Sequence, residues 1–260
     1  MRIKKFIQFT VFISCLFALP LRALTSFELH NISEAHKQGF NGDGVHIGIV
    51  DTIFKEDHEI LVNQFLTTPI RNTYNDKNGF SHGSHVAGII SGSRSNDESY
   101  GIAFKSKFIA YGNLGLGVSD AEFDIMLDFD VKIINNSHTA YHKRFAEYAK
   151  KGILVIYASS NAARLKPTLA ALHGTGSDDN LGSWLTVGNV DSSYIQRDNS
   201  GKLTVAGRAV GGNTGNLCFE ATLYCLMAAG TDILSAAYDT PTSYTKSTGT
   251  SQAAPAVSGV

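Results

Sequence analysis

Short apolar runs alternate with amphipathic segments through the middle of this chain, and the alternation restricts its fold more than any other feature. The amphipathic segments have helical spacing of their apolar residues, and the third ends at Gly152, a residue typical of helix C-termini. Strands that are apolar on both faces and separated by helices predict an α/β fold, with a parallel sheet covered by helices on both faces. The expected strands are 45–50, 108–111, 131–134, 153–157 and 184–190, and the expected helices are 82–91, 121–129 and 140–151.

Residues 1–23 have the layout of a secretory signal peptide. A basic start precedes an apolar run over 6–19, and a small residue, Ala23, lies where cleavage is expected. An uncleaved membrane anchor is the less favoured alternative, because the run is shorter than the roughly 20 residues that span a bilayer. We therefore predict an exported chain with one folded domain over 24–260, in which no internal repeat or linker is evident.

Charge and cysteine usage agree with export. Removing the four cationic residues of the signal segment changes the net charge from −1 to −5, which argues against a nucleic-acid binder with a basic surface. Cys15 belongs to the signal segment, so Cys218 and Cys225 remain. In an oxidising compartment this pair suggests one disulfide, with two buried free thiols as the alternative. A zinc site is not expected, because no second Cys or His pair has ligand spacing nearby.

Three residues of different chemistry each lie at the end or the start of an expected element. Asp51 directly follows the strand 45–50, His82 begins a helix, and Ser251 begins another. Alone, each has an ordinary interpretation: a turn residue, a packed histidine and a helix N-cap. Together they form the acid, base and nucleophile of a hydrolytic serine site, and their order in the chain is the order in subtilisin.

The flanking residues carry the resemblance to a family. The three motifs are GIVDT (48–52), HGSHVAG (82–88) and GTSQAAP (249–255). With them, the chain resembles the subtilisin-like serine protease family over roughly residues 30–260. The resemblance implies a subtilisin-like fold and an exported serine endopeptidase. Asp51, His82 and Ser251 would form the triad of an acyl-enzyme mechanism acting on protein or peptide substrates.

The same resemblance implies an oxyanion hole and a substrate cleft. VIYASSN (155–161) places Asn161 at the family's oxyanion position, together with the backbone N–H of Ser251. Two segments resemble the walls of the family's substrate cleft. The residues expected there are Ser137, His138, Thr139, Ala158, Ser159 and Ser160.

Several positions depart from the family pattern, and three of them leave the level of activity open. Ser160 stands where glycine is usual, His138 where an apolar residue is common, and Gln252 where methionine is common. The alternative function is a catalytically weak or inactive passenger that acts as a surface binding or adhesin module. The presence of all four candidate catalytic groups favours the enzyme, because a binding module has no need of them.

The two ends of the chain suggest a subtype. Only 27 residues separate Ala23 from Asp51, which is too few for a folding propeptide, and the chain stops at Val260 within the helix that Ser251 begins. Both features resemble the passenger part of subtilisin-like autotransporters, so we expect a C-terminally truncated domain from a longer protein. No cofactor is expected, although family habit leaves a structural calcium open. The mature domain would contact no nucleic acid, and no membrane unless a missing translocator attaches it.

Overall fold

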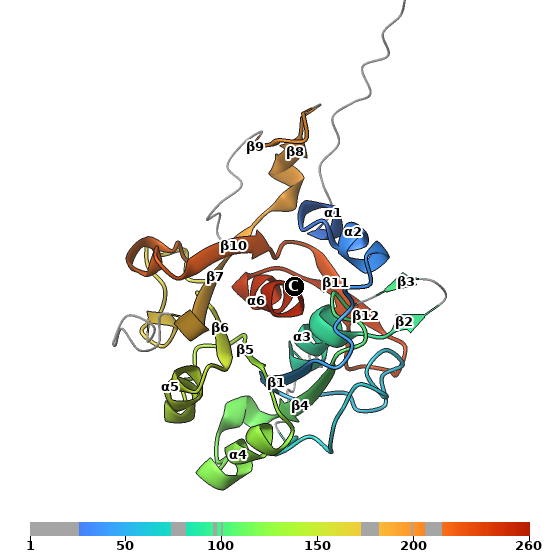
Figure 1. The fold of residues 1–260 in the computed structure, drawn as a ribbon, viewed down its shortest axis with the longest axis vertical. Coiled ribbons are helices and arrows are strands. Elements are labelled where there is room, and N and C mark those ends of the chain that lie inside the picture. The colour runs from blue at the N-terminus through green and yellow to red at the C-terminus, as the bar shows by residue number, and fades with distance from the viewer. Residues whose placement is uncertain are drawn as a thin grey trace, which may run out of the picture.

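A six-stranded, fully parallel sheet forms the centre of the computed structural model, in the order β10-β7-β6-β5-β1-β4 (Figure 1). The predicted parallel sheet is therefore confirmed. Its strands are β1 (His46–Val50), β4 (Lys107–Tyr111), β5 (Ile133–Asn136), β6 (Leu154–Ala158), β7 (Trp184–Val190) and β10 (Cys225–Ala229). The structure describes residues 26–73, 82–95, 98–99, 101–172, 182–198, 200–205 and 215–260. The predicted signal peptide, residues 1–23, lies outside them.

Helices cover both faces of the sheet, as the alternating pattern predicts (Figure 1). On one face α3 (His82–Ser91) packs against α6 (Thr250–Gly259), and on the other lie α4 (Asp120–Asp128) and α5 (Lys143–Lys150). Within the described residues, no helix has the length and apolar character that crossing a membrane requires. The smaller elements are α1 (Ser26–Leu29), α2 (Ile32–Lys37) and the strand pairs β2 (Arg94–Ser95) with β3 (Glu98–Ser99), β8 (Ile195–Arg197) with β9 (Leu203–Val205), and β11 (Ile233–Ala236) with β12 (Tyr244–Ser247).

Strand β1, which lies between β5 and the edge strand β4, contributes side chains to two hydrophobic clusters. Ile47 and Ile49 are fully buried in one cluster with Val86 of α3, whereas Val50 is buried in another with Phe123 of α4. Successive side chains of a strand point to opposite faces, so one apolar run can support helices on both sides. Each such side chain stabilises the folded state by about 1.5–3 kcal/mol when it is fully buried. The sheet that carries the candidate site is therefore held rigid from both faces.

Two predicted starts are wrong by two or more residues, each for a local reason. Helix α5 begins at Lys143 rather than at residue 140, because the carbonyl of Ala140 accepts a hydrogen bond from the Tyr157 hydroxyl (2.7 Å) and is thus committed to a partner outside the helix. Strand β5 begins at Ile133 rather than at residue 131. The N–H of Val131 instead donates to Met126 (3.0 Å) in the turn that ends α4.

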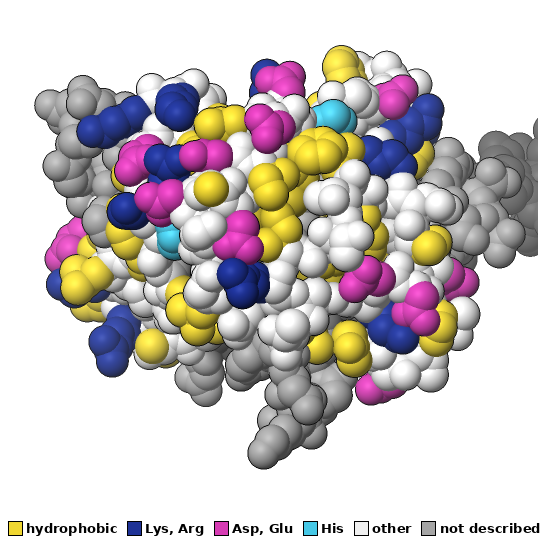
Figure 2. Space-filling view, turned by 90° about the horizontal axis from the view of Figure 1, so that it is seen from below, with side chains coloured by type: hydrophobic (Ala, Val, Ile, Leu, Met, Phe, Trp, Pro, Cys, Tyr) yellow, Lys and Arg dark blue, Asp and Glu magenta, His cyan; other side chains and the backbone are white. Residues whose placement is uncertain are grey.

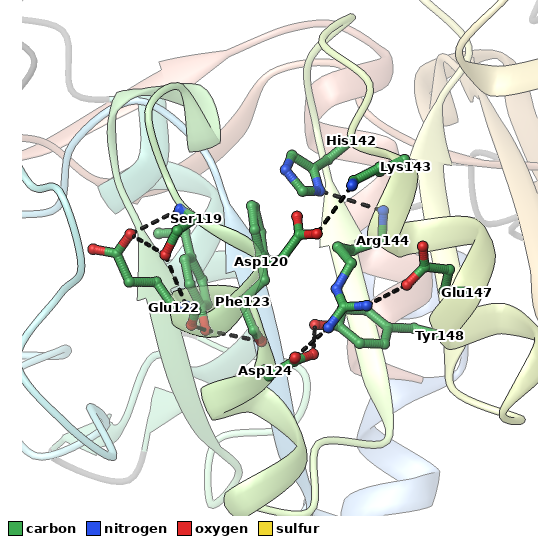
Figure 3. A network of polar contacts seen from close by, with 11 residues as sticks. Ser119, Asp120, Glu122, Phe123, Asp124, His142, Lys143, Arg144, Glu147 and Tyr148 are labelled. Atoms are coloured by element: carbon green, nitrogen blue, oxygen red, sulfur yellow. Dashed lines mark hydrogen bonds and ion pairs between the residues drawn. The ribbon is translucent and has the colours of Figure 1, made fainter.

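Charged side chains join α4 to α5 (Figure 3). Lys143 pairs with Asp120 (2.9 Å), Arg144 pairs with Asp124, and the Tyr148 hydroxyl donates to the Asp124 carboxylate (3.0 Å). Most of these groups are exposed, so each pair adds little alone. Together they fix the position of α5, which follows the loop that ends β5.

The surface seen from below in the orientation of Figure 1 shows acidic and basic side chains interspersed around apolar ones (Figure 2). This distribution matches the nearly balanced totals of 22 basic and 23 acidic residues in the whole sequence.

The predicted disulfide between Cys218 and Cys225 is present, and the two Cα atoms lie 5.8 Å apart. It closes a short loop that ends at Cys225, the first residue of β10. Two large apolar side chains of this loop, Phe219 and Leu223, are exposed to 70% and 90%. Ala221 and Tyr224 of the same loop are buried in the core, so the crosslink closes a loop that is packed on one side only.

We expect the double variant Cys218→Ser/Cys225→Ser to lose about 2–3 kcal/mol of unfolding free energy, because the crosslink no longer restricts the unfolded chain. Urea unfolding of the variant and of the wild type, with and without reductant, measures the difference. Equal midpoints for oxidised wild type and variant would contradict the expectation, and reductant should leave the variant unchanged.

Candidate active site

The candidate site lies at the carboxyl ends of β1 and β5. Val50 pairs with Asn136 in the parallel register, so Asp51 and Ser137 follow at the same edge of the sheet. The chain passes from β1 to β4 on one side and then crosses back to β5 on the other. Such a change of direction opens a crevice in α/β sheets, where ligands commonly bind.

Asp51 and His82 form a short hydrogen bond at this edge. The Nδ1 atom of His82, the first residue of α3, lies 2.7 Å from Oδ1 of the fully buried Asp51. The same oxygen accepts the N–H of Thr52 (2.7 Å), and the Thr52 hydroxyl accepts the N–H of Gly83 (3.0 Å). These contacts hold the carboxylate against the start of α3, and they leave Nε2 of His82 as the nitrogen able to act as a base.

The pair shifts both of its pKa values. Burial alone would lower the pKa of His82, but the charge of Asp51 and the hydrogen bond to it raise the pKa above its usual value. Burial alone would raise the pKa of Asp51, yet the neighbouring His82 holds it below the usual value. The carboxylate is therefore ionised wherever the imidazole functions, and it stabilises the protonated ring.

Ser251 is the second residue of α6, and the helix N-cap is Gly249. The interpretation of Ser251 as an N-cap is thus wrong. Its hydroxyl instead donates a hydrogen bond to the carbonyl oxygen of Ser137 (2.7 Å), directly after β5. This contact brings Ser251 to the strand that neighbours Asp51. Its backbone N–H belongs to the first helical turn, where N–H groups have no helical acceptor and favour negative charge.

Thr250 orients Asn161 beside this helix start. The Oδ1 atom of Asn161 accepts both the N–H (2.8 Å) and the hydroxyl (3.0 Å) of Thr250, which leaves the Nδ2 group as its donor. Gly249 permits the approach: a Cβ atom there would lie 2.8 Å from Asn161 Nδ2, and its φ of +156° is unusual for other residues. The sequence pattern did not single out Thr250, whose role depends on a residue 89 positions away.

A cavity of about 290 Å³ adjoins these groups. Five of the six predicted substrate-binding residues line it, but Ser159 does not. Its side chain is fully buried, and its hydroxyl donates to the carbonyl of Asn216 (2.9 Å). The alternation that continues past β6 turns Ser159 away from the cavity. The lining consists of Ser137, His138, Thr139, Ala158, Ser160, Asn161, Ala162, Thr250 and Ser251.

A family model describing the subtilase family matches residues 42–260. The chain belongs to the subtilase family. The minor extracellular protease Epr of Bacillus subtilis (strain 168) is 24% identical over 201 residues, which are 64% of this chain and 30% of that protein. The chain thus spans about a third of the length of this curated relative.

Solved structures show the same fold at low identity. The PatG macrocyclase in complex with a peptide is 17% identical with a TM-score of 0.62, and 91% of this chain matches 81% of that one. A cold-adapted subtilisin-like serine proteinase is 21% identical with a TM-score of 0.57, and the match covers 85% of this chain and 74% of that one. The subtilisin-like α/β architecture is therefore established for this subtilase.

Ser160 has a strained backbone. Its φ is +96°, a region that L-residues rarely adopt, and it is the position where the family usually has glycine. The surroundings enforce the conformation: the N–H of Ser160 donates to the Thr250 hydroxyl (3.2 Å), and its carbonyl accepts the N–H of Asn216 (2.7 Å). The backbone of Ser160 is thus strained directly before Asn161, the candidate oxyanion donor.

His138, the second departure, lies partly buried close to Asp51 and His82. Its Nδ1 accepts the N–H of Ala140 (3.1 Å). Burial lowers the pKa of His138 to about 4, an effect that the charge of Asp51 only partly opposes. His138 is therefore neutral near pH 7, as is the buried His85, whose pKa burial also lowers to about 4. Gln252, the third departure, is buried in α6, and among the described residues its Nε2 has no hydrogen-bond partner.

The described residues contain no group of three or more His, Cys, Asp or Glu side chains that could hold a metal ion. The calcium site left open by family habit stays untested.

Replacing Ser160 by glycine should raise the unfolding free energy by about 1 kcal/mol, because the positive φ carries a cost for serine that glycine avoids. Thermal and urea unfolding of Ser160→Gly against the wild type measure the gain. Ser160→Ala is the matched control, since it removes the hydroxyl but keeps the backbone cost. A gain equal in both variants would assign the effect to the hydroxyl instead.

The pKa of the His82 ring, followed by NMR of its carbon-bound protons, should lie above the usual value for histidine. In Asp51→Asn the midpoint should fall below that of the wild type, because the charge that raises the pKa is lost while burial persists. His85 serves as an internal control that stays neutral over the same range. An unchanged His82 midpoint in Asp51→Asn would refute the coupling.

Proposed function

We propose that this subtilase is an exported serine endopeptidase in which Ser251 is the nucleophile, His82 the base and Asp51 the residue that orients the base. The observation that carries the proposal is the register of β1 and β5. It places Asp51, bonded to His82, next to Ser137, whose carbonyl holds the Ser251 hydroxyl. Membership of the subtilase family supports serine protease chemistry at this edge.

The first step needs a change in the hydrogen bond of Ser251. A hydroxyl has one proton, and here that proton is donated to Ser137. Rotation about the side-chain bond would redirect it to Nε2 of His82. A substrate backbone N–H that donates to the Ser137 carbonyl competes for that acceptor. Binding of an extended peptide would thus release the hydroxyl toward the base.

Acyl transfer follows. Ser251 Oγ bonds to the substrate carbonyl carbon while His82 takes the hydroxyl proton, and Asp51 stabilises the resulting imidazolium. The C–N bond then breaks as His82 gives that proton to the leaving amine. Water, deprotonated by His82, hydrolyses the acyl-enzyme. Because neutral His82 is required, the rate falls as the pH drops below the raised pKa of His82.

The negative oxygen of the tetrahedral intermediate needs donors. The Nδ2 group of Asn161 and the backbone N–H of Ser251 are suited to this role, because Thr250 orients the first and the start of α6 supplies the second. Donors fixed before the reaction need no reorganisation when the charge develops. Removing one side-chain donor from an oxyanion hole lowers kcat by about 10²–10³, a magnitude taken from subtilisin itself.

Export is supported by the basic and apolar layout of residues 1–23 and by the disulfide between Cys218 and Cys225, a crosslink that persists in oxidising compartments. Protein or peptide substrates follow from the endopeptidase chemistry. The likeness to autotransporter passengers stays a prediction.

A fluorophosphonate probe tests the nucleophile. The wild type should be labelled on Ser251, whereas Ser251→Ala should not be labelled, because the probe reacts only with an activated serine. Asn161→Ala is the matched variant: it keeps the nucleophile but should react far more slowly. A folded wild-type chain that takes no label would favour the binding-module alternative.

A further inference from the structure

A second cavity, of about 450 Å³, adjoins the one at the candidate nucleophile. The two cavities share Thr139, Ser160 and Ala162 in their walls. The second is lined in addition by two cationic residues, Arg164 and Lys166. A substrate side chain that enters the first cavity beside Ser251 can therefore extend along the shared residues toward Arg164 and Lys166.

The buried side chain of Asn216 gives this wall a fixed shape. Its Oδ1 accepts the N–H groups of Ala162 (3.0 Å) and Arg164 (3.1 Å), and its Nδ2 donates to the carbonyl of Lys166 (2.9 Å). Its own N–H donates to the carbonyl of Ser160 (2.7 Å). One residue thus satisfies four backbone groups of the segment 160–166, so the cavity exists before a ligand arrives.

The cavity carries excess positive charge. Within the described part of the chain, the side chain of Arg164 forms no ion pair, and no acidic residue lines either cavity. Lys166 lies 3.4 Å from Glu220, but both side chains are about half exposed, so water weakens that pair. A ligand carboxylate would give Arg164 an ion-pair partner.

We propose that this subtilase selects substrates with an acidic side chain, Glu or Asp, at the residue whose carbonyl Ser251 attacks, and that Arg164 and Lys166 bind that carboxylate. The inference rests on the proposed function for the position of the scissile carbonyl. With the scissile carbonyl between Ser251 and Asn161, the side chain of the same substrate residue would lie along the wall that Thr139 and Ser160 form between the two cavities. A guanidinium matches a carboxylate with two parallel hydrogen bonds, so Arg164 is the main determinant.

Peptide binding to the Ser251→Ala variant of the full chain tests the preference without chemistry. Two fluorescent peptides that differ only by Glu or Gln at this residue should differ about tenfold in Kd, with Glu tighter, because charge-assisted hydrogen bonds to carboxylates are the stronger kind. Adding Arg164→Gln and Lys166→Gln should remove the difference. Equal affinities for Glu and Gln peptides would overturn the proposal, as would a difference that survives both substitutions.

Turnover by the otherwise unchanged enzyme separates this inference from the proposed function. The kcat/KM ratio for Glu over Gln should also be about tenfold and should fall toward one in Arg164→Gln/Lys166→Gln, and with rising salt. Arg197→Gln, which removes an exposed cation bonded to Gly201, is the matched control and should keep the ratio. Hydrolysis without a Glu preference refutes only the inference. A Glu preference in binding without hydrolysis or probe labelling refutes only the proposed function.

Discussion

The pairing of β1 with β5 is the constraint on which the rest of the site depends. Asp51 and Ser137 each come one residue after a strand, and the parallel register brings those two positions together. The other two side chains of the candidate triad are held by hydrogen bonds to these positions: His82 bonds Asp51, and Ser251 bonds the carbonyl of Ser137. A slip of one residue would turn every side chain of β1 to the opposite face, so the buried Ile47 and Ile49 also secure the chemistry.

The fold could be predicted because its strands are buried on both faces. Such strands are continuous apolar runs, and the helix that begins at His82 was predicted with the bounds that it has. The disulfide could be predicted because only two cysteines follow the signal segment. The boundaries at residues 131 and 140 could not, because a helix-ending turn and the Tyr157 hydroxyl decide them. The Tyr157 hydroxyl lies 17 positions from Ala140, so no local pattern shows it.

The candidate triad could be predicted from motifs, but its supports could not. Thr250 lies inside the motif at 249–255 and Asn216 lies outside every motif, but the motifs give no sign that Thr250 bonds the Asn161 side chain or that Asn216 bonds the 160–166 backbone. Ser159 was expected in the substrate cleft, but it does not line the cavity. It stands between two residues that line the cavity, yet its side chain points inward. Proximity in sequence indicated the correct segment without indicating which way each side chain faces.

The hydrogen bond from Ser251 to Ser137 also bears on how the enzyme can be inhibited. In the free protein the Ser251 hydroxyl donates to a backbone carbonyl, so under the proposed function a small electrophile reacts only after that hydroxyl rotates toward His82. A peptide-like electrophile with a backbone N–H can occupy that carbonyl and free the hydroxyl in the same act. Inhibitors of this protein should therefore gain reactivity from their main chain as well as from the fit of their side chains.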